Sequence, residues 1–334
     1  MDAPNLALPV EQPPVLVIRD LRVEFPHHAG KAVVIDGIDL TVDRGKTVCI
    51  VGESGCGKSM LALSTMGLVP PPGRVAGTIM VDRTNIVGLP PTKMRRIRGR
   101  RIAMIFQEPM TSLNPVLSIG YQIMEALKEH DPGASAGTRK ARAIEALVQV
   151  RMPAAERRFH EYPHQLSGGM RQRAMIAMAL ACRPDVLIAD EPTTALDVTI
   201  QAQILELLRD LQRETEMAII LVTHDLGVVA EMADDVAVMY AGRVVEYAPC
   251  RTLFGDPRHP YTIALLASIP SMHEEQGSLL SIEGMVPNAF AMPNGCRFHP
   301  RCVFATEQCP DVSPDLRTLS PAHRVACIHP PLAK

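Results

Sequence analysis

The stretch Gly52–Glu53–Ser54–Gly55–Cys56–Gly57–Lys58–Ser59 is a glycine-rich loop that ends in a lysine and a hydroxyl residue. It follows the short apolar run Lys46–Val51, which predicts a buried strand, and it precedes Ser59–Met66, which predicts a helix. In that arrangement, backbone N–H groups and the positive end of a helix surround phosphate groups. The sequence therefore predicts an α/β fold with a phosphate-binding site for a nucleotide.

Each residue type in this loop has its own expected task. The loop N–H groups face the α- and β-phosphates, Lys58 reaches the β- and γ-phosphates, and Ser59 holds Mg²⁺. We interpret Cys56 as a tolerated small residue rather than a redox switch. Kinases, GTPases, helicases and transport ATPases all use such a loop, so it does not decide the function alone. The predicted nucleotide-binding residues here are Gly52, Ser54, Gly55, Cys56, Gly57, Lys58, Ser59 and Met60.

A second apolar run, Val186–Ala189, ends in two adjacent carboxylates, Asp190 and Glu191. Two acids at the end of a buried strand are costly unless they bind an ion or take part in chemistry. We expect Asp190 to bind Mg²⁺, directly or through water, and Glu191 to act as the general base on the attacking water.

Further along, Leu166-Ser167-Gly168-Gly169-Met170 resembles the signature sequence of ABC ATPases, although Met170 stands where the family most often has Gln. Ser167 is a good N-cap for the predicted helix Gly169–Cys182, and the glycines leave its first N–H groups open to an anion. In the family, this element contacts the γ-phosphate bound to the opposite subunit. The resemblance therefore assigns Ser167, Gly168 and Gly169 to a partner's ATP.

Three more positions match the same family in order. Gln107 resembles the glutamine that touches Mg²⁺ and the transmembrane partner. Asp197, in Ala195–Asp197, resembles the acid at the dimer seam, and His224 resembles the histidine that contacts the γ-phosphate and orients Glu191. Phe25 is the aromatic residue expected to stack on adenine, with Lys31–Val34 as the alternative.

This resemblance implies a P-loop ABC ATPase core with a RecA-like mixed sheet, a helical subdomain at about 95–182, and a small cysteine-rich C-terminal extension. We expect the nucleotide-binding domain at 15–250 and the extension at 251–334. One chain cannot bring its own Ser167 onto its own γ-phosphate. The family solution is a head-to-tail dimer with ATP at the seam.

Four cysteines lie near the C-terminus in the spacing Cys296-x5-Cys302-x6-Cys309-x17-Cys327. Four thiols suit a tetrahedral zinc or an iron–sulfur cluster, and free or disulfide-forming thiols remain the other alternative. The residues around them, together with Arg258–Thr262 and Gly284–Pro287, resemble the C-terminal extension of dipeptide and oligopeptide permease ATPases. Some members of that subfamily carry a 4Fe–4S cluster, which makes a cluster that staples the extension the favoured interpretation.

The composition sets limits on the partners. Lys plus Arg is 34 and Asp plus Glu is 36, so the net charge of −2 gives no reason to expect nucleic-acid binding. No apolar run approaches the roughly 20 residues that a membrane-spanning helix needs. The first 14 residues show no basic region followed by an apolar stretch, so no secretory signal is predicted.

The subfamily implies an ATPase that energises import of di- or oligopeptides at the cytoplasmic face of the bacterial plasma (inner) membrane. The implied partners are a second homologous ATPase, two transmembrane permease subunits and an extracytoplasmic solute-binding protein. The implied cofactors are ATP, Mg²⁺ and a 4Fe–4S cluster. The alternatives are transport of another small solute such as nickel or glutathione, a soluble ABC protein acting on DNA or ribosomes, an exporter ATPase, and a binding module without catalysis.

Overall fold

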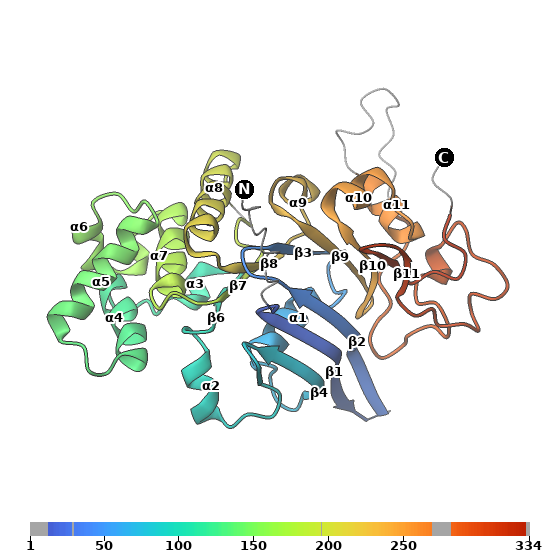
Figure 1. Cartoon of the computed structure of the whole chain (residues 1–334), viewed down its shortest axis with the longest axis horizontal. Helices are drawn as coiled ribbons and strands as arrows, with labels where there is room; N and C mark the ends of the chain where they lie inside the picture. The colour runs from blue at the N-terminus through green and yellow to red at the C-terminus, as the bar shows by residue number, and fades with distance from the viewer. Residues whose placement is uncertain (1–12, 29, 195, 269–281, 332–334) are drawn as a thin grey trace, which may run out of the picture.

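The computed structural model describes residues 13–28, 30–194, 196–268 and 282–331 (Figure 1). Most of the N-terminal stretch inspected for a signal, and Ala195 of the predicted dimer-seam motif, lie outside these residues. The elements are β1 (Leu16–His27), β2 (Gly30–Val42), β3 (Thr47–Val51), α1 (Lys58–Thr65), β4 (Arg74–Val81), β5 (Thr84–Asn85), α2 (Pro91–Ile97), β6 (Ile102–Ile105), α3 (Pro109–Ser112), α4 (Ile119–His130), α5 (Ala136–Gln149), α6 (Ala155–Phe159), α7 (Gly168–Leu180), β7 (Val186–Asp190), α8 (Val198–Thr215), β8 (Ala218–Val222), α9 (Leu226–Met232), β9 (Asp235–Tyr240), β10 (Arg243–Pro249), α10 (Cys250–Gly255), α11 (Pro260–Ala267), β11 (Arg317–Ser320) and β12 (His323–Val325).

The main sheet carries the phosphate loop. Its strand order within the described residues is β11-β12-β10-β9-β3-β8-β7-β6, and the five strands from β9 to β6 run parallel. Strands β3, β7 and β8 are buried along their whole length, which explains why their sequences are continuous apolar runs rather than alternating ones. The carboxyl ends of these three strands therefore meet at one edge of the sheet, where α/β folds bind their ligands.

Alternate residues of β3 face two different cores. Val48 and Ile50 pack toward α1 and a second, antiparallel sheet with strand order β2-β1-β4-β5. Cys49 and Val51 pack into the other core, which also holds the buried faces of α4, α5, α7 and α8. The helices α4 to α7 form a group at the far end of the molecule from the C-terminal segment (Figure 1).

The last described segment returns to the main sheet instead of standing apart from it. Strand β12 pairs antiparallel with β10, through Glu246↔Val325 and Tyr247↔Arg324, and β11 adds beside β12. Glu246 is fully buried at this joint, and its carboxylate accepts hydrogen bonds from the N–H of Arg258 (2.7 Å), the N–H of His259 (2.8 Å) and His323 Nε2 (2.8 Å). The joint therefore fastens the C-terminal segment to the sheet that carries the phosphate loop.

No helix in the ranges that the structure describes is both long enough and apolar enough to cross a membrane.

Candidate nucleotide site

The phosphate loop lies between β3 and α1, as the sequence predicts. Lys58 is buried, and its Nζ donates to the carbonyls of Gly52 (2.7 Å) and Glu53 (3.0 Å), so the ammonium group is held by the backbone of its own loop. The first turn of α1 begins at Lys58, which directs the open N–H groups of a helix N-terminus at the same point. An ammonium group and helix N–H groups that converge in this way suit the β- and γ-phosphates of a nucleotide.

Two glycines in the loop are required by the backbone. Gly52 has φ +151°, and a Cβ there would lie 2.2 Å from the carbonyl oxygen of Met239. Gly57 has φ +108°, and a Cβ there would lie 3.0 Å from the Ile35 side chain. Because the loop is packed this closely against β9 and β2, its N–H groups are held in place before any ligand binds.

Ser59 and Asp190 lie together at the carboxyl end of the parallel strands. Ser59 Oγ donates to Asp190 Oδ1 at 3.2 Å, and Asp190 is 5% exposed. Burial raises the pKa of Asp190 above its ordinary value, more than the hydrogen bond from Ser59 lowers it. A hydroxyl beside a buried carboxylate is a pair of hard oxygen ligands of the kind that Mg²⁺ prefers, and a bound cation would favour the ionised carboxylate.

Glu191 is held by three donors that come from three different segments. Its carboxylate accepts from Gln107 Nε2 (2.9 Å) and Thr194 Oγ1 (2.9 Å), and it lies 3.1 Å from Nδ1 of His224. The Glu191 backbone has φ 47°, a left-handed conformation that costs a non-glycine residue about 1–3 kcal/mol. A strained backbone and a carboxylate with three hydrogen-bond partners together indicate that the surrounding structure fixes the position of Glu191.

The electrostatics of Glu191 and Asp190 differ. Burial acts to raise the pKa of Glu191, but the hydrogen bonds with His224 and Thr194 and the nearby charges of His224 and Lys58 together hold it below its ordinary value. Glu191 is therefore ionised at neutral pH and able to accept a proton. The pKa of Asp190 is raised instead, and a bound cation would stabilise its ionised form. Two carboxylates with opposite shifts fit the two separate roles predicted for them.

The predicted signature residues lie elsewhere on the molecule. Ser167 is the N-cap of α7 and accepts from the N–H of Met170 at 3.4 Å, and Asp197 is the N-cap of α8 and accepts from the N–H of Ile200 at 2.9 Å. Ser167, Gly168, Gly169 and Asp197 line one open hollow of about 560 Å³, whose lining includes none of the phosphate-loop residues. The structure thus brings the signature residues and Asp197 together with each other but not with Lys58.

Phe25 lies near the end of β1, half-buried. A Cβ on Gly73 would lie 2.8 Å from its ring, so the ring packs on the loop at Gly73. Stacking of Phe25 on adenine stays a prediction, and so does the alternative at Lys31–Val34.

The four C-terminal cysteines share one small cavity. Cys296, Cys302, Cys309 and Cys327 all line a space of about 20 Å³ beside Phe298. Burial, with a smaller contribution from the neighbouring thiols, raises the pKa of Cys302 to about 11, so this thiol is protonated at neutral pH unless a metal binds. The part of the chain that the structure describes contains no group of three or more His, Cys, Asp or Glu side chains that could hold a metal ion.

Sequence reasoning missed three residues that act on the site. Thr194 holds Glu191, Tyr261 accepts from the backbone N–H of Glu53 (2.8 Å), and Arg301 pairs with the Glu53 carboxylate. Thr194 lies only three residues after Glu191, so its closeness in sequence to the predicted base is a signal that could have identified it. Tyr261 and Arg301 are more than 200 residues from Glu53, and no local pattern reveals such contacts.

Comparison with known proteins agrees with this geometry. The family model described as "ABC transporter" matches residues 35–194, and the model "Oligopeptide/dipeptide transporter, C-terminal region" matches residues 245–309. A solved dimer of an ATP-binding cassette, in a post-hydrolysis state with ADP and Pi bound, superposes with a TM-score of 0.64 at 29% identity, covering 71% of this chain and 99% of that one. The fold and site therefore define the class: the protein is an ATPase of the ABC type, built on a mixed α/β sheet.

Relatives of known role cover almost the whole chain. The dipeptide transport ATP-binding protein DppD of Haemophilus influenzae is 49% identical over 319 residues, which are 95% of this chain and 96% of DppD. The oligopeptide transport ATP-binding protein OppD of Salmonella typhimurium is 48% identical over 320 residues, which are 95% of this chain and 94% of OppD. The chain belongs to this family of dipeptide and oligopeptide transport ATP-binding proteins.

Proposed function

We propose that this protein hydrolyses ATP at a site shared with a second ABC ATPase and so energises import of di- or oligopeptides by a membrane transporter. One observation carries the catalytic part: Glu191, ionised and fixed by Gln107, Thr194 and His224, lies beside the Ser59–Asp190 pair. The peptide substrate is supported by the names of the relatives, which are dipeptide and oligopeptide transport proteins.

In this proposal the residues of the site divide the work. Lys58 and the loop N–H groups would bind the β- and γ-phosphates. Ser59, Asp190 and Gln107 would hold Mg²⁺, which would supply positive charge against the charge that develops on the phosphate oxygens. Glu191 takes a proton from the attacking water as the water oxygen bonds to the γ-phosphorus and the bond to the ADP oxygen breaks. His224 orients Glu191 and contacts the γ-phosphate.

The position of the signature residues favours a shared site. Ser167 caps a helix on a hollow that lies apart from Lys58, so the N–H groups of Gly168 and Gly169 are open to a phosphate from another chain. A dimer related head to tail would place two ATP molecules between two such surfaces, with Asp197 at the seam. Binding of ATP would then close the dimer and hydrolysis would open it, because only the closed form makes both sets of contacts.

We further propose the domain division and the partners. The nucleotide-binding domain comprises residues 15–250 with its helical subdomain at about 95–182, and the extension begins at 251. The other subunits are a homologous ATPase, two transmembrane permeases and an extracytoplasmic solute-binding protein, with this chain at the cytoplasmic face of the bacterial plasma membrane.

Reconstitution tests this function. The chain, purified with its membrane subunits and placed in proteoliposomes, should take up a labelled dipeptide or tripeptide only when Mg-ATP and the binding protein are present. Uptake of nickel or glutathione instead would revise the assigned transport substrate but leave the assignment as a transport ATPase unchanged. Co-purification with ribosomes or DNA and with no membrane subunit would overturn the transport assignment.

We also propose a 4Fe–4S cluster on Cys296, Cys302, Cys309 and Cys327. Each thiolate of such a cluster binds a different iron, so the four sulfurs need to surround a common space without converging on one point. Four thiols that line one cavity agree with that requirement. Its proposed role is to staple a segment with little core of its own.

Anaerobically purified protein should be brown and contain about four irons and four sulfides per chain if this proposal holds. Cys296→Ser should lose the colour, while Cys182→Ser should keep it, because Cys182 follows α7 and does not line the cavity. Zinc in stoichiometric amount with no iron would overturn the cluster.

A further inference from the structure

Two arginines in the segment Cys296–Cys302 reach from the C-terminal region to the phosphate loop and to the strands that support it. Arg297 directly follows Cys296, and Arg301 directly precedes Cys302. Their side chains are 13% and 6% exposed, so both are largely buried against the first half of the chain. A buried guanidinium needs partners for its fixed fork of donors, and both arginines find them at the phosphate loop or at the strands that support it.

Arg301 makes a two-point pair with Glu53, the second residue of the phosphate loop. Its Nη1 donates to Oε2 at 2.7 Å and its Nη2 donates to Oε1 at 2.9 Å. The remaining guanidinium donors reach the carbonyls of residues 282–284 at 2.8–3.3 Å, so the arginine itself is fixed. Hydrogen bonding to Glu53 raises the pKa of Arg301, so this guanidinium stays charged.

The main chain of Glu53 is held from the same side. Its N–H donates to the hydroxyl of Tyr261 at 2.8 Å, and Tyr261 is fully buried on α11. Tyr261 in turn packs on Tyr240 and Phe298, with ring centroids 4.7 and 5.4 Å away. Both the backbone and the side chain of Glu53 are therefore set by residues after position 250.

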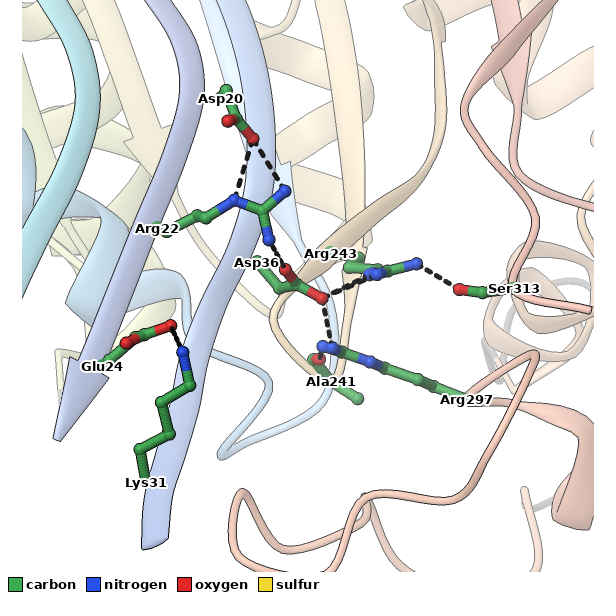
Figure 2. Close-up of polar contacts among 9 residues, drawn as sticks. All are labelled: Asp20, Arg22, Glu24, Lys31, Asp36, Ala241, Arg243, Arg297 and Ser313. Carbon is green, nitrogen blue, oxygen red and sulfur yellow. Dashed lines mark hydrogen bonds and ion pairs between the residues drawn. The ribbon is translucent and has the colours of Figure 1, made fainter. Parts of the chain in front are cut away.

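Arg297 supports the other half of the loop. It donates to the Asp36 carboxylate and to the carbonyl of Ala241, at the turn between β9 and β10 (Figure 2). The next residue, Gly242, donates its N–H to the carbonyl of Cys56 in the phosphate loop at 2.8 Å. Figure 2 also shows Arg22 and Arg243 on the same Asp36 carboxylate, which ties β1, β2 and β10 to this point.

These contacts bear on catalysis because the loop must present its N–H groups in one geometry. Glu53 and Cys56 lie on either side of the loop's apex, and each is restrained through a residue of the C-terminal segment. Preorganised donors bind phosphate more tightly than donors that must first be ordered, since the ordering cost is already met on folding.

We propose that Arg301, through Glu53, is a positioning residue for the phosphate loop, with Arg297 as a second support through the β9–β10 turn. The C-terminal region is then part of the nucleotide site's framework, in addition to any role toward transport partners. This inference rests on the proposed nucleotide site, and it assigns the ATP affinity of the enzyme partly to residues outside the ATPase core.

The test compares Arg301→Gln, Glu53→Gln and the double variant in the full-length chain, by titration with a fluorescent ATP analogue and Mg²⁺. Loss of one charged hydrogen-bonded pair should weaken binding by about 10- to 100-fold. The double variant should bind about as weakly as either single variant, because both remove the same interaction. Arg301→Lys, which keeps the charge but not the fork, should fall between wild type and Arg301→Gln.

Arg317→Gln is the matched control, since Arg317 donates to the carbonyl of Ile328 within the C-terminal region, and this substitution should leave nucleotide affinity unchanged. In the assembled transporter, KM for ATP should rise in Arg301→Gln by the same factor as the dissociation constant, with kcat at saturating ATP nearly unchanged. Wild-type affinity in Arg301→Gln, or additive effects of the two single variants, would overturn the positioning role. Lys58→Ala separates the two levels: if it binds ATP normally, the proposed site itself is wrong.

Discussion

At the scale of single residues, the arrangement around Glu191 leads to the most specific prediction about ATP hydrolysis. Glu191→Gln keeps the shape of the side chain but cannot accept a proton. We expect kcat for ATP hydrolysis to fall at least about 100-fold while the dissociation constant for ATP changes little. Phosphate-release kinetics and nucleotide titration measure the two quantities. The control is Glu206→Gln, an exposed residue of α8 that pairs with Arg151, and equal turnover in Glu191→Gln and wild type would remove Glu191 as the base.

The hydrogen bond from Thr194 gives a pH prediction. A base must be deprotonated, so activity is present above the pKa of Glu191 and is lost as the pH falls through it. Thr194 helps to lower that pKa, so Thr194→Val should raise it and move the acid limb of the kcat profile to higher pH. Thr215→Val, whose hydroxyl bonds Leu211 at the other end of α8, should leave the limb in place. An unmoved limb in Thr194→Val would show that another group titrates.

Local motifs predicted that Lys58, Ser59, Asp190 and Glu191 share one site. The structure places them together at the carboxyl edge of the parallel strands, where Lys58 and Ser59 begin α1 and Asp190 ends β7. Their roles toward ATP and Mg²⁺ stay predictions. The bond between Gln107 and Glu191 joins the residues that follow β6 and β7. The Arg301–Glu53 pair joins residues 248 apart, and only the folded chain brings them together.

At the scale of elements, the hydrogen bonds of Glu246 predict how much the contact between β10 and the C-terminal region contributes to the free energy of unfolding. Glu246→Ala leaves the N–H groups of Arg258 and His259 and the ring of His323 buried without their acceptor. We expect the free energy of unfolding to fall by about 2–5 kcal/mol. Urea denaturation and the rate of proteolysis after residue 250 both measure this loss.

Glu231→Ala is the control for that change, because Glu231 forms an exposed ion pair with Arg209 on the surface and should cost less than about 1 kcal/mol. If Glu246→Ala unfolds at the same urea concentration as wild type, the buried carboxylate contributes nothing to the joint.

The predicted element types are confirmed where the sequence carries a clear pattern. The apolar runs Lys46–Val51 and Val186–Ala189 correspond to strands β3 and β7, and the predicted helix Gly169–Cys182 corresponds to α7. Strands β11 and β12 were not predicted, because segments of four and three residues are too short to show periodicity and depend on β10 for pairing.

At the scale of the whole molecule, the separation of Ser167 from Lys58 predicts association driven by ATP. The Glu191→Gln chain, alone or mixed with its partner ATPase, should double its apparent mass on light scattering when Mg-ATP is added and not when Mg-ADP is added. Ser167→Arg should abolish this change without loss of ATP binding to Lys58. Association that persists in Ser167→Arg would place the interface elsewhere.

The pairing of β12 with β10 has a consequence for the newly made chain. Every residue of the ATP site up to His224 leaves the ribosome about a hundred residues before β12 does. Strand β10 ends at Pro249, about 74 residues before β12 begins at His323, and for that later interval the outer edge of β10 has no neighbour. An open strand edge with Val244 and Val245 beside it is a template for pairing with another chain. A product that ends before β11 would therefore contain all the catalytic motifs and still be prone to aggregate. Synthesis of β11 and β12 removes this tendency, because β12 covers the open edge of β10.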